Sequence, residues 1–300
     1  MSYFTTQDEA LHLAASRDGH RFAALNGGAP LLRSTVGSQT LRDPFVGPGP
    51  DGLFHLLATD GWTSRSIVHA VSADLRAWSA PELIPVMDGV PGAHNAWAPE
   101  FFYDSARQCY QLIWSSVVEQ PSGRNGVRDW QDTGQDHRIW GCLTKDFRSY
   151  SPAELFFDPG FPVIDATVAR DGDRFLMAFK DERGVNDLTT SYKHILLTTF
   201  KKPGETFEPT FGPVSPAPVE GPALFRRDGE WVLIFDHFLE GRYGAVSSRD
   251  GLSWSPAEVV VPADARHASV LTLDSSSPLR FNFEELPLWS IHQNSPAEPC

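Results

Sequence analysis

The amino-acid sequence predicts an all-β protein folded as a five-bladed β-propeller, in which a single domain spans residues 1–300. Three observations support this prediction. A turn pattern recurs along the chain, a strand–turn–strand unit precedes most copies of it, and glycine and proline number 24 each among 300 residues. The 3.6-residue periodicity of an amphipathic helix is nowhere sustained over three turns.

The recurring turn reads Ser or Thr, any residue, Asp, three residues and then an aromatic. Its copies are SRDGHRF at 16–22, SADLRAW at 72–78, TKDFRSY at 144–150 and SRDGLSW at 248–254, with a degenerate TFKKPGETF at 199–207. Four periods of about 58 residues separate Asp18 from Asp250. An Asp at this place accepts hydrogen bonds from its own backbone and the aromatic begins the next strand, so each copy predicts a hairpin turn.

The unit upstream of the turn consists of two β-rich runs around a polar turn. It occupies residues 42–59, 98–116, 164–180 and 220–236. Together with the recurring turn, each repeat therefore contains four short strands. Four-stranded units of this length, repeated about five times, are typical of a five-bladed propeller.

The two ends of the chain predict how the ring closes. After Arg266, the run HASVLTLD reads as the first strand of a fifth blade, but little strand-like sequence follows it. The segments LHLAAS and RFAAL, on either side of the Asp18 turn, read as the missing outer strands. We therefore predict that the N-terminal strands complete the last blade, which removes an open sheet edge.

Composition and charge exclude several classes of partner and site. A pI near 5.1 argues against a nucleic-acid partner, and no run approaches the roughly 18 apolar residues of a membrane span. Cys109, Cys142 and Cys300 form no C-x-x-C motif, so neither a zinc knuckle nor a dithiol site is expected. The first residues lack the features of a secretory signal, which favours a cytoplasmic location unless a signal has been lost. The oligomeric state is left open.

The first strand of each propeller blade lines the central axis. Five residues with a carboxyl or imidazole side chain lie near the start of these predicted strands. They are Asp43, Glu100, Asp165, Glu220 and His267. Four carboxyl groups and an imidazole are thus expected at one mouth of the channel. Carboxyl groups that converge in a partly dry funnel acquire different pKa values, which an acid/base pair requires.

The loops between second and third strands should surround this mouth, at residues 60–66, 117–137, 181–193 and 237–242. An aromatic floor with a few charged groups suits a sugar ring. Trp62 and Trp97 are the candidate stacking platforms, although packing between blades explains Trp97 equally well. The full set of candidate substrate contacts is Trp62, His94, Trp97, Glu100, Asp181, His237, Arg242 and His267.

Four short motifs at blade spacing resemble those of glycoside hydrolase family 43, over residues 11–273. They are Arg42-Asp43-Pro44, Trp97-Ala98-Pro99-Glu100, Ile164-Asp165-Ala166 and Glu220-Gly221-Pro222. The resemblance implies that Asp43 is the general base, that Glu220 is the general acid, and that Asp165 orients this acid and keeps it protonated. It implies no required cofactor, with His267 a weak candidate for contact with a calcium ion near the axis. Glu100 departs from the Asp that many members carry, so the particular substrate of the better-studied members is not carried over to this chain.

The activity expected from the resemblance is inverting hydrolysis of arabinofuranosyl or xylosyl linkages in plant-type oligosaccharides. In such an enzyme the acid and base stand about 6.5–9.5 Å apart, which admits a water molecule. The length of the 117–137 loop favours action on chain ends or side branches. The alternatives are a galactosidase, another glycosidase or a phosphorylase on the same fold, and a carbohydrate-binding propeller without catalysis.

Overall fold

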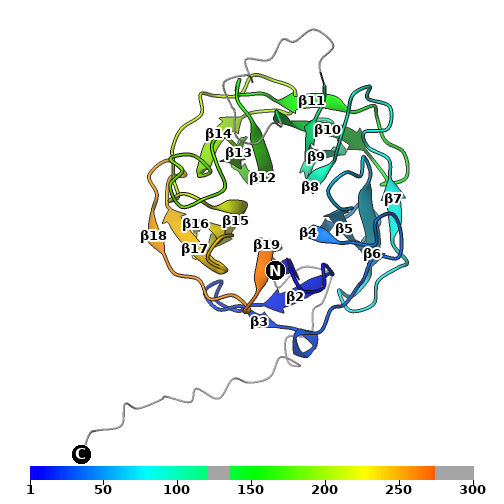
Figure 1. Cartoon of the computed structure of the whole chain (residues 1–300), viewed down its shortest axis with the longest axis horizontal. Helices are drawn as coiled ribbons and strands as arrows, with labels where there is room; N and C mark the ends of the chain where they lie inside the picture. The colour runs from blue at the N-terminus through cyan, green and yellow to red at the C-terminus, as the bar shows by residue number, and fades with distance from the viewer. Residues whose placement is uncertain (120–135, 274–300) are drawn as a thin grey trace, which may run out of the picture.

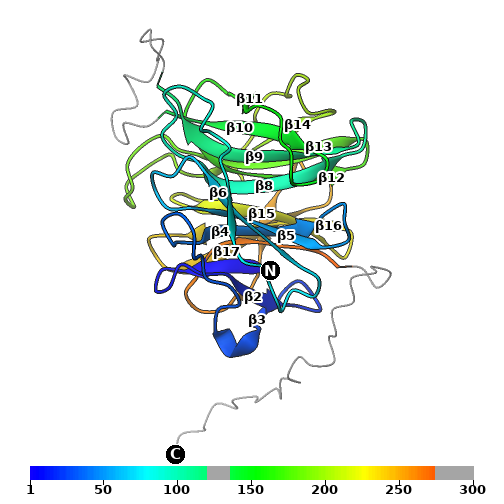
Figure 2. The same ribbon diagram turned by 90° about the vertical axis from the view of Figure 1, so that its right-hand side faces the viewer.

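The computed structural model describes residues 1–119 and 136–273, and these form five small β-sheets around a central axis (Figure 1). Seen from the side, the innermost strands run along this axis (Figure 2). The predicted five-bladed, all-β architecture is therefore confirmed. Within the described residues the one helical element is the short η1 (Asn26–Gly28), and no helix there is long and apolar enough to cross a membrane.

The first two blades follow the predicted order of four antiparallel strands, from the axis outward. Blade one contains β4 (Arg42–Pro48), β5 (Phe54–Thr59), β6 (Ile67–Ser72) and β7 (Glu82–Ile84). Blade two contains β8 (Trp97–Asp104), β9 (Cys109–Val117), β10 (His137–Thr144) and β11 (Glu154–Phe157).

The third and fourth blades differ in their outermost strand. Blade three contains β12 (Val163–Asp171), β13 (Arg174–Asp181) and β14 (Ile195–Phe200), and an isolated bridge from Leu197 to Phe211 stands where a fourth strand would be. Blade four contains β15 (Glu220–Arg227), β16 (Glu230–His237), β17 (Arg242–Ser248) and β18 (Ser255–Ala257). The short fourth strand is lost beside the degenerate copy of the recurring turn.

Blade five closes the ring with strands from both ends of the described chain. Its order is β19 (Ala265–Ser269), β1 (Ser2–Thr5), β2 (His12–Ala15) and β3 (Ala23–Ala24). The prediction that N-terminal strands complete the last blade is confirmed. The sequence reading missed β1, which lies between β19 and β2 and pairs with both. Blade five is tied to blade one by the hydroxyls of Ser2 and Ser269, which lie 2.7 and 3.1 Å from the carbonyl oxygen of Pro44.

The recurring turns owe their shape to the aspartate that the pattern contains. Asp74 accepts hydrogen bonds from the backbone N–H groups of Arg76 and Ala77, at 2.8 and 2.9 Å. Asp250 does the same for Leu252 and Ser253 at 2.8 Å. Ser and Thr two residues before each Asp accept a further N–H, as Ser72 does from Leu75 at 2.8 Å. These local bonds satisfy the backbone at the tip of the hairpin.

Apolar side chains pack in the spaces between neighbouring blades and form five clusters. Many of the aromatic side chains pack there. Trp114, for example, is 1% exposed in a cluster shared by blades one and two, which also contains Phe101 and Phe147. Cys109 and Cys142 are buried free thiols, and Cys109 lies at the start of β9. The remaining cysteine, Cys300, lies outside the described residues.

The position of β1 makes a stability prediction. Tyr3 is 2% exposed and its ring lies 5.2 Å from that of His12 in a stacked arrangement. Replacing it (Tyr3→Ala) should lower the free energy of unfolding by about 3–5 kcal/mol, because a large aromatic side chain leaves a cavity in the closing blade. Chemical denaturation followed by tryptophan fluorescence measures this loss.

Tyr103→Ala is the matched control, because Tyr103 is 48% exposed. It should lower the free energy of unfolding by less than about 1 kcal/mol. Equal small losses in both variants would show that β1 does not hold the ring together.

Candidate active site

Each innermost strand carries the same irregularity close to one mouth of the channel. The ladder register shifts after Arg42 in β4, Trp97 in β8, Ile164 in β12 and Glu220 in β15, and beside Arg266 in β19. The next residue has a positive φ in every case: Asp43 (49°), Ala98 (48°), Asp165 (57°), Gly221 (55°) and His267 (36°). We call this residue the bulge position of its strand. A bulge re-aims side chains, and here it does so five times at one level.

The bulges show that the five candidate axis residues are not equivalent. The structure places all five in the innermost strands, as the pattern predicts. Asp43, Asp165 and His267 occupy the bulge position itself. Glu220 lies one residue before it, and Glu100 lies two residues after it.

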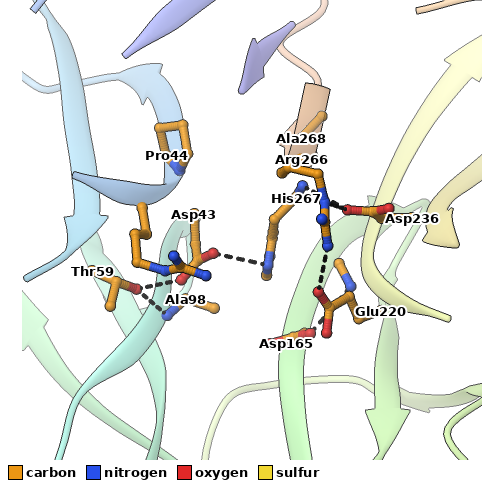
Figure 3. A network of polar contacts seen from close by, with 12 residues as sticks. Asp43, Pro44, Thr59, Ala98, Asp165, Glu220, Asp236, Arg266, His267 and Ala268 are labelled. Carbon is orange, nitrogen blue, oxygen red and sulfur yellow. Dashed lines mark hydrogen bonds and ion pairs between the residues drawn. The ribbon is translucent and has the colours of Figure 1, made fainter. Parts of the chain in front are cut away.

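Asp43 is held as an ionised carboxylate by two donors. Thr59 Oγ1 donates to Asp43 Oδ2 at 2.6 Å, and His267 Nδ1 lies 3.2 Å from Asp43 Oδ1 (Figure 3). Burial raises the pKa of Asp43, but His267, Arg42 and Thr59 together outweigh it and lower this pKa to about 2. Asp43 therefore stays ionised at every physiological pH.

His267 is a cation at the centre of this group. Burial lowers its pKa, but the carboxylates of Asp43 and Asp165 overcome this effect and raise the pKa to about 10. Calcium prefers oxygen ligands, which an imidazole does not supply. Among residues 1–119 and 136–273 no cluster of three or more His, Cys, Asp or Glu side chains is arranged to hold one. The calcium ion stays a prediction without support from the geometry around His267.

Asp165 connects blade three to its two neighbours. Its N–H donates to Ser115 Oγ of blade two, and its Oδ2 accepts from the N–H of Gly221 in blade four, both at 3.1 Å. Burial raises the pKa of Asp165 to about 6, and the charges of Glu220 and Asp43 act in the same direction. Asp165 thus fixes the backbone directly beside Glu220.

Glu220 is contacted by one cation at each carboxylate oxygen. Lys180 Nζ lies 3.1 Å from Oε2, and Arg266 Nη2 lies 3.4 Å from Oε1. The side chain of Glu220 is 25% exposed, so a ligand in the channel can reach it. Each cation also holds a second carboxylate: Lys180 that of Glu182 at 2.9 Å, and Arg266 that of Asp236 at 2.6 Å.

Sequence reasoning missed these four residues: Lys180 and Arg266, which contact Glu220, and Glu182 and Asp236, which these two cations also hold. A signal for two of them was present. Lys180 and Asp236 are charged residues that follow the apolar middle of the second strands β13 and β16, and they are buried to 2% and 0% exposure. In the ladder they stand opposite Ile164 and Glu220, so each reaches the bulge level. A buried charge on a strand that faces the next blade needs a partner there.

Glu100 differs from the other carboxyl groups in its proton affinity. It is 9% exposed, and burial raises its pKa to about 8 despite nearby Thr167 and His267. Glu100 therefore keeps its proton at neutral pH. It lies further along its strand than Ala98, which occupies the bulge position in blade two.

The two candidate stacking tryptophans lie against each other at the rim. Their rings meet edge to face at 5.5 Å, and Trp97 Nε1 donates to the carbonyl oxygen of Trp62 at 2.9 Å. Arg42 stacks on Trp62 at 4.5 Å, and His137 covers Trp97 at 4.7 Å. Trp62 remains 63% exposed despite these contacts.

The other rim candidates are engaged within their own loops. His94 pairs with Glu119 at 3.2 Å, and both His237 and Arg242 contact Glu240, at 3.4 and 2.9 Å. These residues lie at the rim but are not brought to the carboxylates. Residues 120–135, most of the long loop expected to wall off the groove, lie outside the described residues.

Asp181 differs from the expectation for a substrate contact. It is fully buried, and its carboxylate accepts hydrogen bonds from Arg183 Nε at 2.9 and 3.0 Å. His194 Nε2 lies 3.6 Å from it on the other side of the loop. This carboxylate anchors the loop that follows β13, and it has no exposed surface for a ligand.

Comparisons with known proteins agree with this architecture. The α-L-arabinofuranosidase of Bifidobacterium longum subsp. longum is 26% identical in an alignment 266 positions long, and the match covers 74% of this chain. The chain spans only about a quarter of that relative, 25% of its length.

Solved structures share the fold at low identity. The exo-β-1,3-galactanase from Phanerochaete chrysosporium has a TM-score of 0.55 at 11% identity, with 84% of this chain and 54% of that chain covered. The α-L-arabinofuranosidase from Lactobacillus brevis has a TM-score of 0.53 at 16% identity, with 73% of each chain covered. A family model described as a probable glycosyl hydrolase domain, related to glycoside hydrolase family 43, matches residues 1–277. The chain therefore belongs to this family-43-like family of glycosyl hydrolase domains.

Proposed function

We propose that this protein hydrolyses glycosidic bonds with inversion, with Glu220 as general acid, Asp43 as general base and Asp165 as the residue that positions the acid. The observation that carries the proposal is the placement of Asp43 and Glu220 at one bulge level, in the blades on either side of blade five. Figure 3 draws them on opposite sides of the strand that carries Arg266 and His267.

Asp43 has the state that a general base requires. It is ionised, and its two donors, Thr59 and His267, orient both carboxylate oxygens. A base that activates water must be charged before the reaction begins, and the lowered pKa of Asp43 ensures this. His267 also supplies a positive charge beside the water that Asp43 would polarise.

Glu220 has the exposure and orientation that a general acid requires. Its backbone is fixed by the hydrogen bond from the Gly221 N–H to Asp165. Gly221 has a φ of 55°, and a Cβ atom there would lie 2.9 Å from His267 Cγ, so glycine is needed beside the acid. The carboxyl group of Glu220 can therefore be presented to a leaving oxygen without movement of the backbone.

We propose an α-L-arabinofuranoside as the first substrate to test, followed by a β-D-xyloside. The arabinofuranosidase relative and the exposed ring of Trp62 support this choice. A β-D-galactoside is the alternative, because the galactanase structure matches the fold equally well. The partner of the site is in each case an oligosaccharide or a glycoside.

The two catalytic roles predict different responses to leaving-group chemistry. Asp43→Asn should lower kcat/KM by about 10²–10⁴-fold on nitrophenyl glycosides and on oligosaccharides alike, because both need activated water. Glu220→Gln should lose a similar factor on oligosaccharides but clearly less on nitrophenyl glycosides, whose leaving group needs little protonation. Initial rates on both substrate types measure this difference.

Glu240→Gln is the matched control, since Glu240 is a rim carboxylate whose side chain is 41% exposed. Its kcat/KM should stay within about twofold of the wild-type value on both substrates. Wild-type turnover in both Asp43→Asn and Glu220→Gln would contradict the proposed function.

A small substrate panel tests the sugar and the stereochemistry together. Nitrophenyl α-L-arabinofuranoside should give the highest kcat/KM, above the β-D-xyloside and the β-D-galactoside. NMR of the first product should show the inverted anomer. A dependence of the rate on added phosphate would indicate a phosphorylase instead, and sugar binding without any turnover would indicate a binding module.

The pKa values predict the acidic side of the pH profile. Asp165, with a pKa of about 6, becomes protonated as the pH falls through that value, whereas Asp43, with a pKa of about 2, stays charged. The value of kcat/KM should therefore decline below about pH 6 because Asp165 is neutralised. A constant kcat/KM between pH 7 and pH 4, in protein shown to be folded by circular dichroism, would contradict a required charge on Asp165.

A further inference from the structure

Both cations that contact Glu220 are shared with a second carboxylate, and in both cases the second contact is the shorter one. Lys180 Nζ lies 3.1 Å from Glu220 but 2.9 Å from Glu182. Arg266 lies 3.4 Å from Glu220 but 2.6 Å from Asp236. Neither cation depends on the charge of Glu220 for its own neutralisation.

Lys180 is unusual because a lysine is seldom buried so completely. It is 2% exposed, on the second strand of blade three, and its Nζ lies 4.9 Å from the ring centre of Phe238. Burial lowers the pKa of a lysine, but Glu182, Glu220 and Asp165 raise that of Lys180 well above its usual range. Lys180 is therefore a permanent cation at the side of Glu220.

Glu182 is fixed from two sides. Its Oε2 pairs with Lys180, and its Oε1 accepts a hydrogen bond from Lys193 Nζ, both at 2.9 Å. Lys193 is fully buried, and it also donates to the carbonyl oxygen of Glu182 at 3.3 Å. Burial raises the pKa of Glu182, but the two lysines outweigh it and lower this pKa below its usual value. Glu182 therefore stays ionised while Glu220 exchanges a proton.

A general acid has to alternate between a neutral and an ionised form in each turnover. A buried cation left without a counter-ion in one of these forms would be strongly destabilising. We propose that Lys180 is a positioning residue for Glu220 and that Glu182 is the permanent counter-ion which lets Glu220 take up and release its proton. This inference rests on the proposed function, because it assigns Glu220 as the acid.

The charged and titratable groups around Glu220 come from every element packed against it. They are Lys180 and Glu182 from blade three and the loop after it, Lys193 before β14, Asp165 on β12, Asp236 on β16, Tyr243 on β17, and Arg266 and His267 on β19. Among them, Lys180 and Arg266 make the contacts with its carboxylate oxygens.

The experiment measures the pH dependence of kcat/KM. The alkaline limb of this profile reports the loss of the proton from the acid. Lys180→Met removes a cation that favours ionised Glu220, so the limb should move to higher pH by about one unit or more. Glu182→Gln leaves Lys180 with Glu220 alone, so the limb should move to lower pH. Lys180→Arg keeps the charge and should return the limb towards its wild-type position.

Lys193→Met is the matched control, because it removes an equally buried cation that contacts Glu182 but not Glu220. It should shift the limb by less than half as much as Lys180→Met. Thermal unfolding of each variant verifies that the measured protein is folded.

The outcomes separate this inference from the proposed function. Shifts in opposite directions for Lys180→Met and Glu182→Gln support the inference, since a purely structural loss lowers kcat without moving the limb. An unmoved limb in folded Lys180→Met, or equal shifts in Lys180→Met and Lys193→Met, would overturn it. Undiminished activity of Glu220→Gln on oligosaccharides would instead overturn the assignment of the acid.

Discussion

One repeated constraint shapes the site: each innermost strand bulges at the same level, and the N–H group that leaves the ladder there needs an acceptor. A buried N–H group without a partner costs free energy. Thr59 accepts the N–H of Ala98, and Ser115 accepts that of Asp165. In the next blade Asp165 itself accepts the N–H of Gly221. The bonds that hold neighbouring blades together therefore lie where the carboxyl groups converge, and the proposed catalytic residues are part of the closure of the ring.

Burial in the channel, together with the partners of each group, separates the proton affinities of carboxyl groups that lie close together. Desolvation alone would raise the pKa of every carboxyl group. Asp43 ends at about 2 because His267 and Thr59 stabilise its charge, whereas Glu100 ends at about 8 because desolvation dominates. At neutral pH one carboxyl group of the funnel is thus a stable anion and another keeps its proton. The donors around each carboxyl group, and not burial alone, therefore decide its charge.

The sequence predicts those features that depend on local signals. The aspartate turns, the number of blades and the positions of the inner strands all follow from patterns within a few residues. Strand β1 could not be predicted in this way, because Ser2–Thr5 is short and no recurring turn precedes it. The ion pairs around Glu220 could not be predicted because their members lie far apart in the sequence: Lys180 and Glu220 are 40 residues apart. The bulge register could not be predicted for the same reason, since partners in other blades decide which residue leaves the ladder.

In three blades the residue one position before the bulge contacts the second strand of the preceding blade: Arg42 stacks on Phe4, Arg266 binds Asp236, and Glu220 binds Lys180. A charged or cation–π pair therefore recurs between blades, and in two cases it involves an arginine that stays charged at all accessible pH values. Only in the third pair does the residue before the bulge, Glu220, carry a carboxyl group. Because a carboxyl group can exchange a proton and an arginine cannot, a contact that serves the cohesion of the ring elsewhere becomes available for chemistry between blades three and four.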